Sequence, residues 1–123
     1  MQSINADMLI CPVNAHAATK ISNVEHLAGQ SHYSFMCNIC DLPTGVIPFT
    51  VVKDGEDSGY TDHHNDRITR MIAEDMQGTV GLPLGIQVIG LPYQDEKLLG
   101  VMKRMDDARK FRPVPKLIAK DVE

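Results

Sequence analysis

The sequence has little cysteine and no long apolar run. Its three cysteines, Cys11, Cys37 and Cys40, are an odd number and too few for a disulfide-stabilised secreted domain, which favours a reducing compartment. No basic residue precedes Lys20, and the apolar run at residues 8–11 is too short for a secretory signal. The long uncharged stretch over residues 76–93 is interrupted by glycines and prolines and does not fit a membrane-spanning helix. We therefore expect an intracellular protein or a fragment.

Basic residues are scarce in the first half of the chain. Residues 1–61 hold two basic and six acidic residues, whereas residues 62–123 hold ten of each. The net charge of −4 does not fit a protein that binds nucleic acid through bulk positive charge. Eight basic residues lie between Lys97 and Lys120, and only two acidic residues accompany them. This stretch is the candidate surface for an anionic partner such as a membrane, although a helix dipole explains basic residues at a helix end equally well.

The remaining composition is that of a globular protein. The chain has 123 residues, of which 43% are hydrophobic and 23% charged. These values fit one domain and lie outside the disordered, collagen and coiled-coil classes.

Three short apolar segments predict strands, at residues 8–11, 45–52 and 84–89. Pro48 favours an edge position or a bulge for the second strand, because proline cannot donate to a sheet ladder. The third strand is apolar on much of both faces, as strands covered by helices on both sides require. We expect a sheet that needs more strands and helices than this chain provides, which indicates part of a larger fold.

Helical patterns separate the strands. A short helix is expected around residues 24–28, and a buried helix over residues 33–40 that Ser31 begins. Asp62 is expected to cap an amphipathic helix that ends at Gly78, and a last helix follows Pro92. The alternation of strands and helices predicts an α/β fold.

Three sequence blocks carry a resemblance to a known family. They are Asp-Met-Leu-Ile-Cys-Pro at residues 7–12, Tyr-Ser-Phe-Met-Cys-Asn-Ile-Cys-Asp-Leu-Pro-Thr-Gly-Val-Ile-Pro at 33–48, and Val-Gly-Leu-Pro-Leu-Gly-Ile-Gln-Val-Ile-Gly-Leu-Pro-Tyr at 80–93. In this order they resemble the C-terminal end of amidase-signature serine hydrolases, and most closely the fatty-acid amide hydrolase branch. The resemblance implies part of a three-layer α/β/α sandwich with a mixed sheet, incomplete in this chain. Residues 1–111 would form the C-terminal portion of that domain, and residues 112–123 a tail.

The resemblance also implies hydrolysis of carbon–nitrogen amide bonds by a serine nucleophile, a second serine and a lysine base. In the family these residues lie in a Gly/Ser-rich region upstream of the matching segment, and no such region occurs here. We therefore assign no catalytic residue, no metal and no cofactor to this chain. We expect it to be inactive alone, and poorly folded or oligomeric because sheet edges and helix faces stay uncovered.

A substrate-binding role is implied for three positions. Ser31 and Phe35 match positions that wall the acyl-chain channel of the branch, and Ile68 matches a nearby helix position where the branch often carries tryptophan. Core packing is the competing interpretation of Phe35 and Ile68, since both lie on apolar helix stripes. The implied partner of the full-length enzyme is a lipid amide substrate, with peripheral membrane contact and a homo-oligomer as further expectations.

Cys37 and Cys40 support a hypothesis of another class. Together with His26 and His32 they supply four ligands, enough for a tetrahedral zinc site in a small non-enzymatic binding module. However, the two cysteines lie in an apolar helical stretch, where cysteine usually packs as a small hydrophobic residue. Free thiols are therefore the competing interpretation.

Overall fold

The computed structural model of the chain describes residues 5–111. The predicted tail at residues 112–123 lies outside the described residues. Within the described range, the chain forms three strands, three α-helices and two 3-10 helices. The strands are β1 (Leu9–Pro12), β2 (Thr44–Val51) and β3 (Pro83–Ile89). The helices, in chain order, are η2 (Ile21–Asn23), η3 (Ala28–Ser31), α1 (His32–Ile39), α2 (Arg67–Met76) and α3 (Asp95–Arg109).

The three strands form one open sheet in the order β1-β3-β2, with β3 in the centre. Both pairings are antiparallel, so the described part of the sheet contains no parallel pair. Cys11 of β1 and Val46 of β2 both lie opposite Gln87 of β3. The register of β2 shifts between Pro48 and Thr50, which confirms the irregularity predicted from Pro48.

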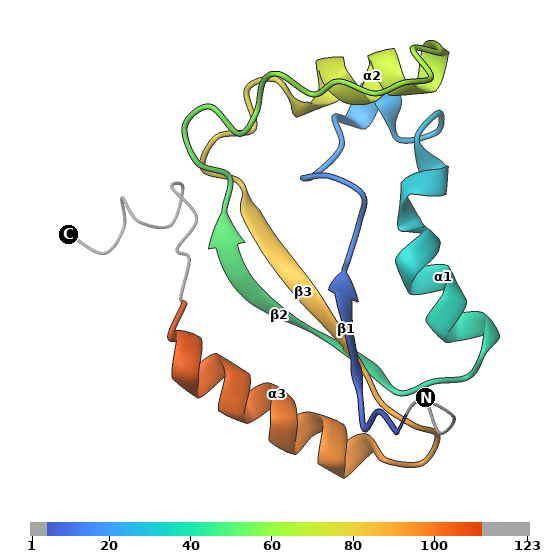
Figure 1. The fold of residues 1–123 in the computed structure, drawn as a ribbon, viewed down its shortest axis with the longest axis vertical. Helices are drawn as coiled ribbons and strands as arrows, with labels where there is room; N and C mark the ends of the chain where they lie inside the picture. The colour runs from blue at the N-terminus through green and yellow to red at the C-terminus, as the bar shows by residue number, and fades with distance from the viewer. Residues whose placement is uncertain (1–4, 112–123) are drawn as a thin grey trace.

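Helices α1 and α3 lie on opposite sides of the strands, and α2 lies beyond the end of the sheet where β3 begins (Figure 1). Alternation along β3 explains this arrangement, because successive strand residues point to opposite faces. The Gln87 side chain hydrogen-bonds to α1, whereas its neighbour Val88 faces the other side and is fully buried. A helix on both faces of the sheet is consistent with part of an α/β fold.

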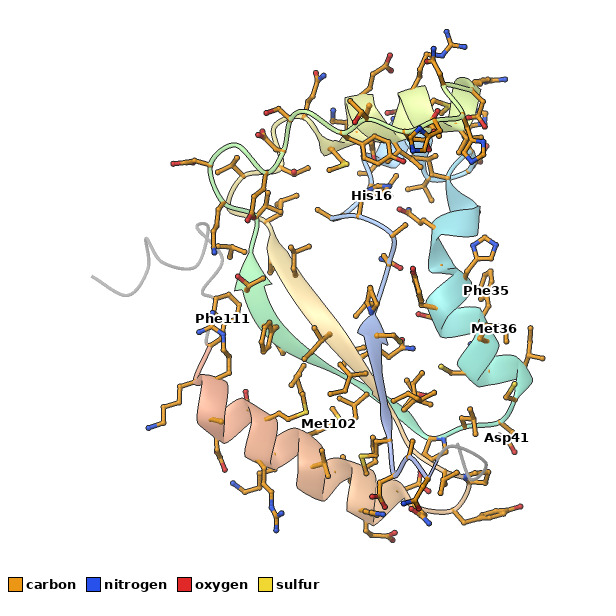
Figure 2. The ribbon with its side chains drawn as sticks, viewed as in Figure 1. His16, Phe35, Met36, Asp41, Met102 and Phe111 are labelled. Carbon is orange, nitrogen blue, oxygen red and sulfur yellow. The ribbon has the colours of Figure 1, made fainter. Side chains whose placement is uncertain are left out.

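The core on the α3 side is built from Ile47, Val88 and Leu98, each at most 5% exposed. Met102 of α3 lies directly over Gly45 of β2, and Figure 2 shows it pointing from the helix toward the strands. A Cβ atom at Gly45 would overlap the Sδ and Cε atoms of Met102. The end of the Met102 side chain would therefore have to shift to accommodate a residue larger than glycine at position 45.

Arg109 joins the end of α3 to β2. Its Nε donates a hydrogen bond to the carbonyl oxygen of Phe49 at 2.9 Å. Its guanidinium carbon lies 5.4 Å from the ring centroid of Phe49 and 5.5 Å from that of Phe111. These are cation–π distances, so Arg109 joins the helix to the strand through both hydrogen bonding and packing.

Helix α2 begins later than predicted. Asp66, not Asp62, is the N-cap, and its carboxylate accepts the backbone N–H of Thr69 at 2.9 Å. Asp62 instead accepts the backbone N–H of His64 and the phenol of Tyr60, in the turn before the helix. The prediction of an Asp62 cap is wrong because its carboxylate is used by this earlier turn. Gly78, with φ +77°, follows the helix end as predicted.

The prediction of a buried helix at residues 33–40 is also wrong. Of the residues of α1, only Cys37 is buried. The exposed fraction is 52% for Phe35, 59% for Met36 and 78% for Ile39. Ser31 holds the N-cap position of α1, but its side chain makes no capping hydrogen bond. The helix forms where expected, and its outer apolar face has no described element packed against it.

The segment at residues 24–28 forms no α-helix, contrary to the expectation. Turns connect η2 to η3, with backbone hydrogen bonds from Leu27 to Asn23 and from Gln30 to Leu27. The Leu27 side chain is 3% exposed and anchors this segment. The mixture of Ala, Asn and His without apolar periodicity explains why only isolated turns form.

Candidate functional site

A buried polar contact joins the centre of the sheet to α1. The Gln87 side chain is 1% exposed, and its Nε2 lies 3.1 Å from the carbonyl oxygen of Tyr33 and 3.2 Å from the Cys37 sulfur. Its Oε1 accepts from the Ser34 hydroxyl at 3.4 Å. This role was not predicted from the sequence, although a glutamine within an apolar strand is a detectable signal, because a buried amide needs partners.

Cys11 of β1 belongs to the same cluster. The Gln87 Nε2 lies 3.5 Å from its sulfur. Burial and the neighbouring Cys37 raise the pKa of the Cys11 thiol, whereas the contact with Gln87 partly offsets this. A raised pKa lowers the thiolate fraction at neutral pH, so Cys11 is poorly suited to act as a nucleophile. The cluster is therefore suited to positioning α1.

A second buried polar contact holds the segment before α1. Asp75 of α2 is fully buried, and both of its carboxylate oxygens lie 3.2 Å from the backbone nitrogen of Lys20. The Asn23 side-chain amide donates to the same carboxylate at 2.9 Å. The Lys20 ammonium donates to the carbonyl oxygen of Glu74 at 2.7 Å. Because a buried carboxylate needs such partners, Asp75 determines where the segment leading into η2 lies.

The predicted substrate-binding residues lie on two different helices. Ser31 and Phe35 are four residues apart at the start of α1, a spacing that places them on one side of a helix. Phe35 lies on the side of α1 turned away from the strands (Figure 2). Ile68 is in the first turn of α2 and is 46% exposed. Phe35 and Ile68 are thus not core residues within the described chain, which leaves both available to a ligand or to another polypeptide segment.

The four predicted zinc ligands are not gathered into one site. Cys37 is buried against Gln87, whereas Cys40, His26 and His32 are exposed. Between residues 5 and 111, no three His, Cys, Asp or Glu side chains are grouped so that they could hold a metal ion. The zinc-binding module stays a prediction that no structural cluster supports.

Two serine hydroxyls, those of Ser22 and Ser34, donate hydrogen bonds to side-chain amide oxygens. Ser34 donates to Gln87 Oε1, and Ser22 donates to Asn23 Oδ1, both at 3.4 Å. A hydrolytic serine needs a base that accepts its proton, and an amide oxygen is a very weak base. Neither contact resembles an activated nucleophile.

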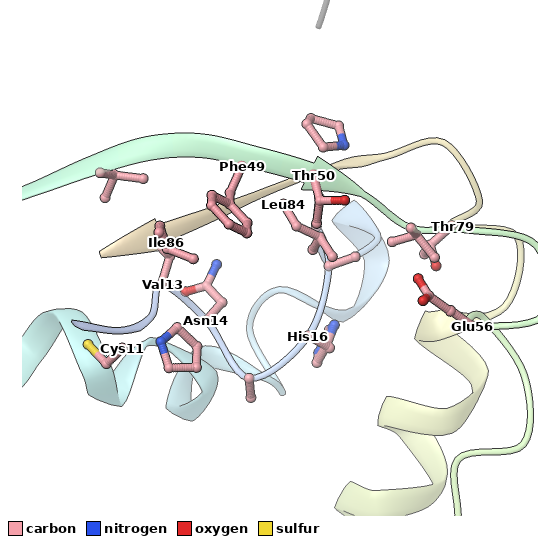
Figure 3. A pocket seen from close by; sticks show the side chains of 18 of the residues that line it. Cys11, Val13, Asn14, His16, Phe49, Thr50, Glu56, Thr79, Leu84 and Ile86 are labelled. Carbon is pink, nitrogen blue, oxygen red and sulfur yellow. The ribbon is translucent and has the colours of Figure 1, made fainter. Parts of the chain in front are cut away.

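A cavity lies where the loop after β1 passes the beginning of β3. It has a volume of about 730 Å³. Apolar side chains form most of its wall, Thr79 and Glu56 lie together at one end, and Asn14 lies beside Val13 and Ile86 (Figure 3). His16, Phe49, Thr50 and Leu84 also line it. Ser31, Phe35 and Ile68 are not among the lining residues, so this cavity differs from the predicted acyl-chain wall.

Comparison with known protein families is consistent with the open three-stranded sheet and the exposed face of α1. The family model described as Amidase matches residues 1–99. The chain belongs to the amidase family. Two amidase relatives are similar along most of its length. Fatty acid amide hydrolase 1 of Caenorhabditis elegans is 26% identical over 110 residues, which are 88% of this chain and 19% of the relative. Fatty-acid amide hydrolase 1 of Sus scrofa is 27% identical over 109 residues, 85% of this chain and 18% of the relative.

The chain thus spans about a fifth of the length of these amidase relatives. The described portion holds no helix with the length and apolar character needed to cross a membrane.

Proposed function

We propose that this chain is the C-terminal part of a fatty-acid amide hydrolase-like enzyme. In this role it contributes core packing and part of the wall that contacts the acyl chain of a lipid amide, and it has no hydrolytic activity alone. The observation that carries the proposal is the exposed apolar face of α1, where Phe35, Met36 and Ile39 are all more than half exposed. An apolar face of this size on a short helix is stabilised when a ligand or further chain covers it.

The proposed inactivity follows from the chemistry that the chain lacks. Amide hydrolysis by this family's mechanism needs an activated serine and donors that stabilise the oxyanion. The chain has no Gly/Ser-rich region, and Ser22 and Ser34 donate to amide oxygens. Purified chain incubated with oleamide should release no ammonia above the buffer rate. It should also not react with a fluorophosphonate serine probe, whereas a full-length fatty-acid amide hydrolase tested in parallel should do both. Ammonia release that the probe abolishes would contradict the proposal.

The proposed acyl-chain wall is testable in a longer enzyme. A fatty-acid amide hydrolase in which this chain replaces the corresponding C-terminal fifth provides the catalytic serine. Phe35→Ala and Ile68→Ala should each lower kcat/KM for an amide of eighteen carbons more than for one of eight carbons, because a shorter wall loses apolar contacts with the longer chain. Tyr93→Ala is the matched control, since Tyr93 is 94% exposed and lies on neither helix. Equal chain-length preference in all variants would exclude this role.

Peripheral membrane contact through the C-terminal basic stretch is a further part of the proposal. Three of its residues already have partners: Lys97 lies 2.5 Å from Asp7, Lys103 lies 2.8 Å from Asp107, and Arg109 packs on Phe49. Exposed pairs of this kind are weak, so an anionic surface can compete for the lysines. Co-sedimentation with phosphatidylserine vesicles at low salt, and its loss in phosphatidylcholine vesicles, is the expected result.

A homo-oligomer is proposed on the basis of the sheet edges. Within the described strands, β1 and β2 each pair only with β3, which leaves one edge of each strand open. Open edges favour pairing with another chain. Light scattering coupled to size-exclusion chromatography should show a mass above 13.6 kDa, and a sharp monomer peak would contradict this expectation.

A further inference from the structure

The cavity beside β3 is lined mostly by apolar side chains, with polar groups at one end and along the loop after β1. Phe49, Leu84 and Ile86 are among the apolar lining residues, Glu56 and Thr79 lie together at one end, and Asn14 and His16 come from the loop after β1 (Figure 3). The volume of about 730 Å³ lies within the range of cavities that hold small organic ligands. This combination fits a molecule that has an apolar body and one polar head group.

His16 contributes buried polar atoms that have no hydrogen-bond partner in the described part of the chain. Both of its ring nitrogens are buried, and neither has a hydrogen-bond partner among the described residues. Leaving a buried polar atom without a partner costs free energy, because the atom loses its bonds to water. A ligand head group inside the cavity would supply the missing bond.

Two further polar side chains, Thr79 and Glu56, limit what the head group can be at their end of the cavity. The Thr79 hydroxyl donates its proton to the carbonyl oxygen of Met76 at 2.6 Å, so toward a ligand its oxygen acts as an acceptor. The Glu56 carboxylate offers only acceptors, and its Oε2 already holds the backbone N–H of Lys53 at 2.9 Å. Toward Glu56 and Thr79 the head group must therefore donate hydrogen bonds, and the carboxylate favours a positive charge.

We propose that this cavity binds a primary ammonium ion with an alkyl or arylalkyl chain. The ammonium group has three donors and no acceptor, which matches one His16 ring nitrogen, the Glu56 carboxylate and the Thr79 hydroxyl oxygen. The chain lies against Phe49, Leu84 and Ile86. An anionic amphiphile is disfavoured by Glu56, and an alcohol has only one donor for three acceptors. The proposal does not depend on amide hydrolysis.

Three probes with the same chain and different head groups test this assignment. The purified chain, labelled with ¹⁵N, is titrated with octylammonium, octanol and octanoate below their micelle concentrations. Octylammonium should produce saturable amide shifts at residues 13–18, 49–56 and 84–86, with a Kd at least tenfold lower than that of octanol. Octanoate should bind more weakly than both. Equal affinity for octanol, or no saturable shift with octylammonium in whatever oligomeric state the chain adopts, would overturn the proposal.

Two substitutions locate the head group. Glu56→Gln keeps the shape of an exposed side chain and removes its charge, so the fold should be retained. It should weaken octylammonium binding about tenfold and leave octanol binding unchanged. The loss of one charge-assisted hydrogen bond lowers the affinity by about that factor. His16→Phe should weaken octylammonium in the same way. Asp54→Asn is the matched control, since it removes a charge from the same loop outside the cavity lining. Wild-type affinity in Glu56→Gln would place the head group elsewhere and refute the site.

Discussion

The Gln87 side-chain amide donates to the carbonyl oxygen of Tyr33 across 3.1 Å, and so ties the central strand to α1. The two residues are 54 positions apart in the chain. Because Gln87 is 1% exposed, its amide has no access to water that could replace this bond. The position of α1, and with it of Phe35, depends on this contact.

Gln87→Met should destabilise the chain. Methionine has a similar length but no donor, so the polar atoms of α1 that face Gln87 lose their partner. We expect a loss of about 1–3 kcal/mol in the free energy of unfolding, as for other buried hydrogen bonds left incomplete. Urea denaturation followed by circular dichroism measures it. Gln77→Met, at an exposed position, is the control and should change stability little. A neutral Gln87→Met variant would show that the amide does not hold α1.

Two glycines should respond to alanine in opposite directions. Gly45→Ala places a Cβ against the Sδ and Cε atoms of Met102, and should lower stability by about 1–2 kcal/mol. Gly100 lies within α3 with open space around it, so Gly100→Ala should raise stability by about 0.5–1 kcal/mol. Thermal unfolding of both variants is the measurement. The cost of Gly45→Ala should shrink in a Met102→Ala background, and an unchanged cost there would contradict the proposed overlap.

The Asp66 cap makes α2 sensitive to acid. The backbone N–H of Thr69, which donates to the carboxylate, holds the pKa of Asp66 below its ordinary value. A group with a lowered pKa in the folded state stabilises the fold above its unfolded pKa of about 3.9, and this contribution is lost as the pH falls through the folded pKa. Hydrogen exchange of the Thr69 amide should therefore accelerate below about pH 4 relative to its intrinsic rate.

Asp66→Asn is the informative variant for the cap. An asparagine oxygen still accepts the Thr69 N–H but does not titrate, so the acid-dependent loss of protection at Thr69 should be smaller. Asp62→Asn should leave this acid-dependent loss unchanged, because Asp62 accepts from His64 and Tyr60 instead. If Asp62→Asn, and not Asp66→Asn, changed the behaviour of Thr69, the cap would be assigned to the wrong residue.

The three cysteines should react with iodoacetamide at different rates. Cys40 is exposed and should be alkylated first, whereas Cys37 is buried and should react last. Cys11 should be slow at neutral pH, because burial raises the pKa of its thiol and lowers the thiolate fraction. Its rate should rise as the pH approaches that raised pKa. Mass spectrometry of quenched samples gives the order, and early modification of Cys37 would indicate that α1 opens readily from the sheet.

The helices and strands that depend on local sequence patterns were predicted correctly. The apolar segment at residues 84–89 predicted β3 within one residue, and α3 confirms the helix predicted after Pro92. Pro48 indicated the irregularity in β2. The motif series indicated the amidase family, which the family match over residues 1–99 confirms. These features depend on side-chain periodicity and on glycine and proline geometry, which act over a few residues.

The wrong predictions concern residues whose interaction partners are distant in the sequence or absent from the described chain. The sequence predicted Asp62 as the cap of α2, whereas Asp66 holds that position because the preceding turn uses the Asp62 carboxylate. The apolar residues of α1 resemble a core helix in sequence, yet Phe35 and Ile39 remain exposed because burial requires a second surface. The cavity around His16 escaped prediction because its wall comes from four separate segments.

The sequence by itself determined the family and the strand positions, since both depend on residue types and their spacing. Only the tertiary structure decided that Gln87 holds α1, that Met102 lies over Gly45, and that His16 lies unpartnered in a cavity with Glu56. These relationships join residues that are roughly 40 to 60 positions apart. Hydrogen bonds and close packing act over a few ångströms, so they exist only once the chain has brought such residues together.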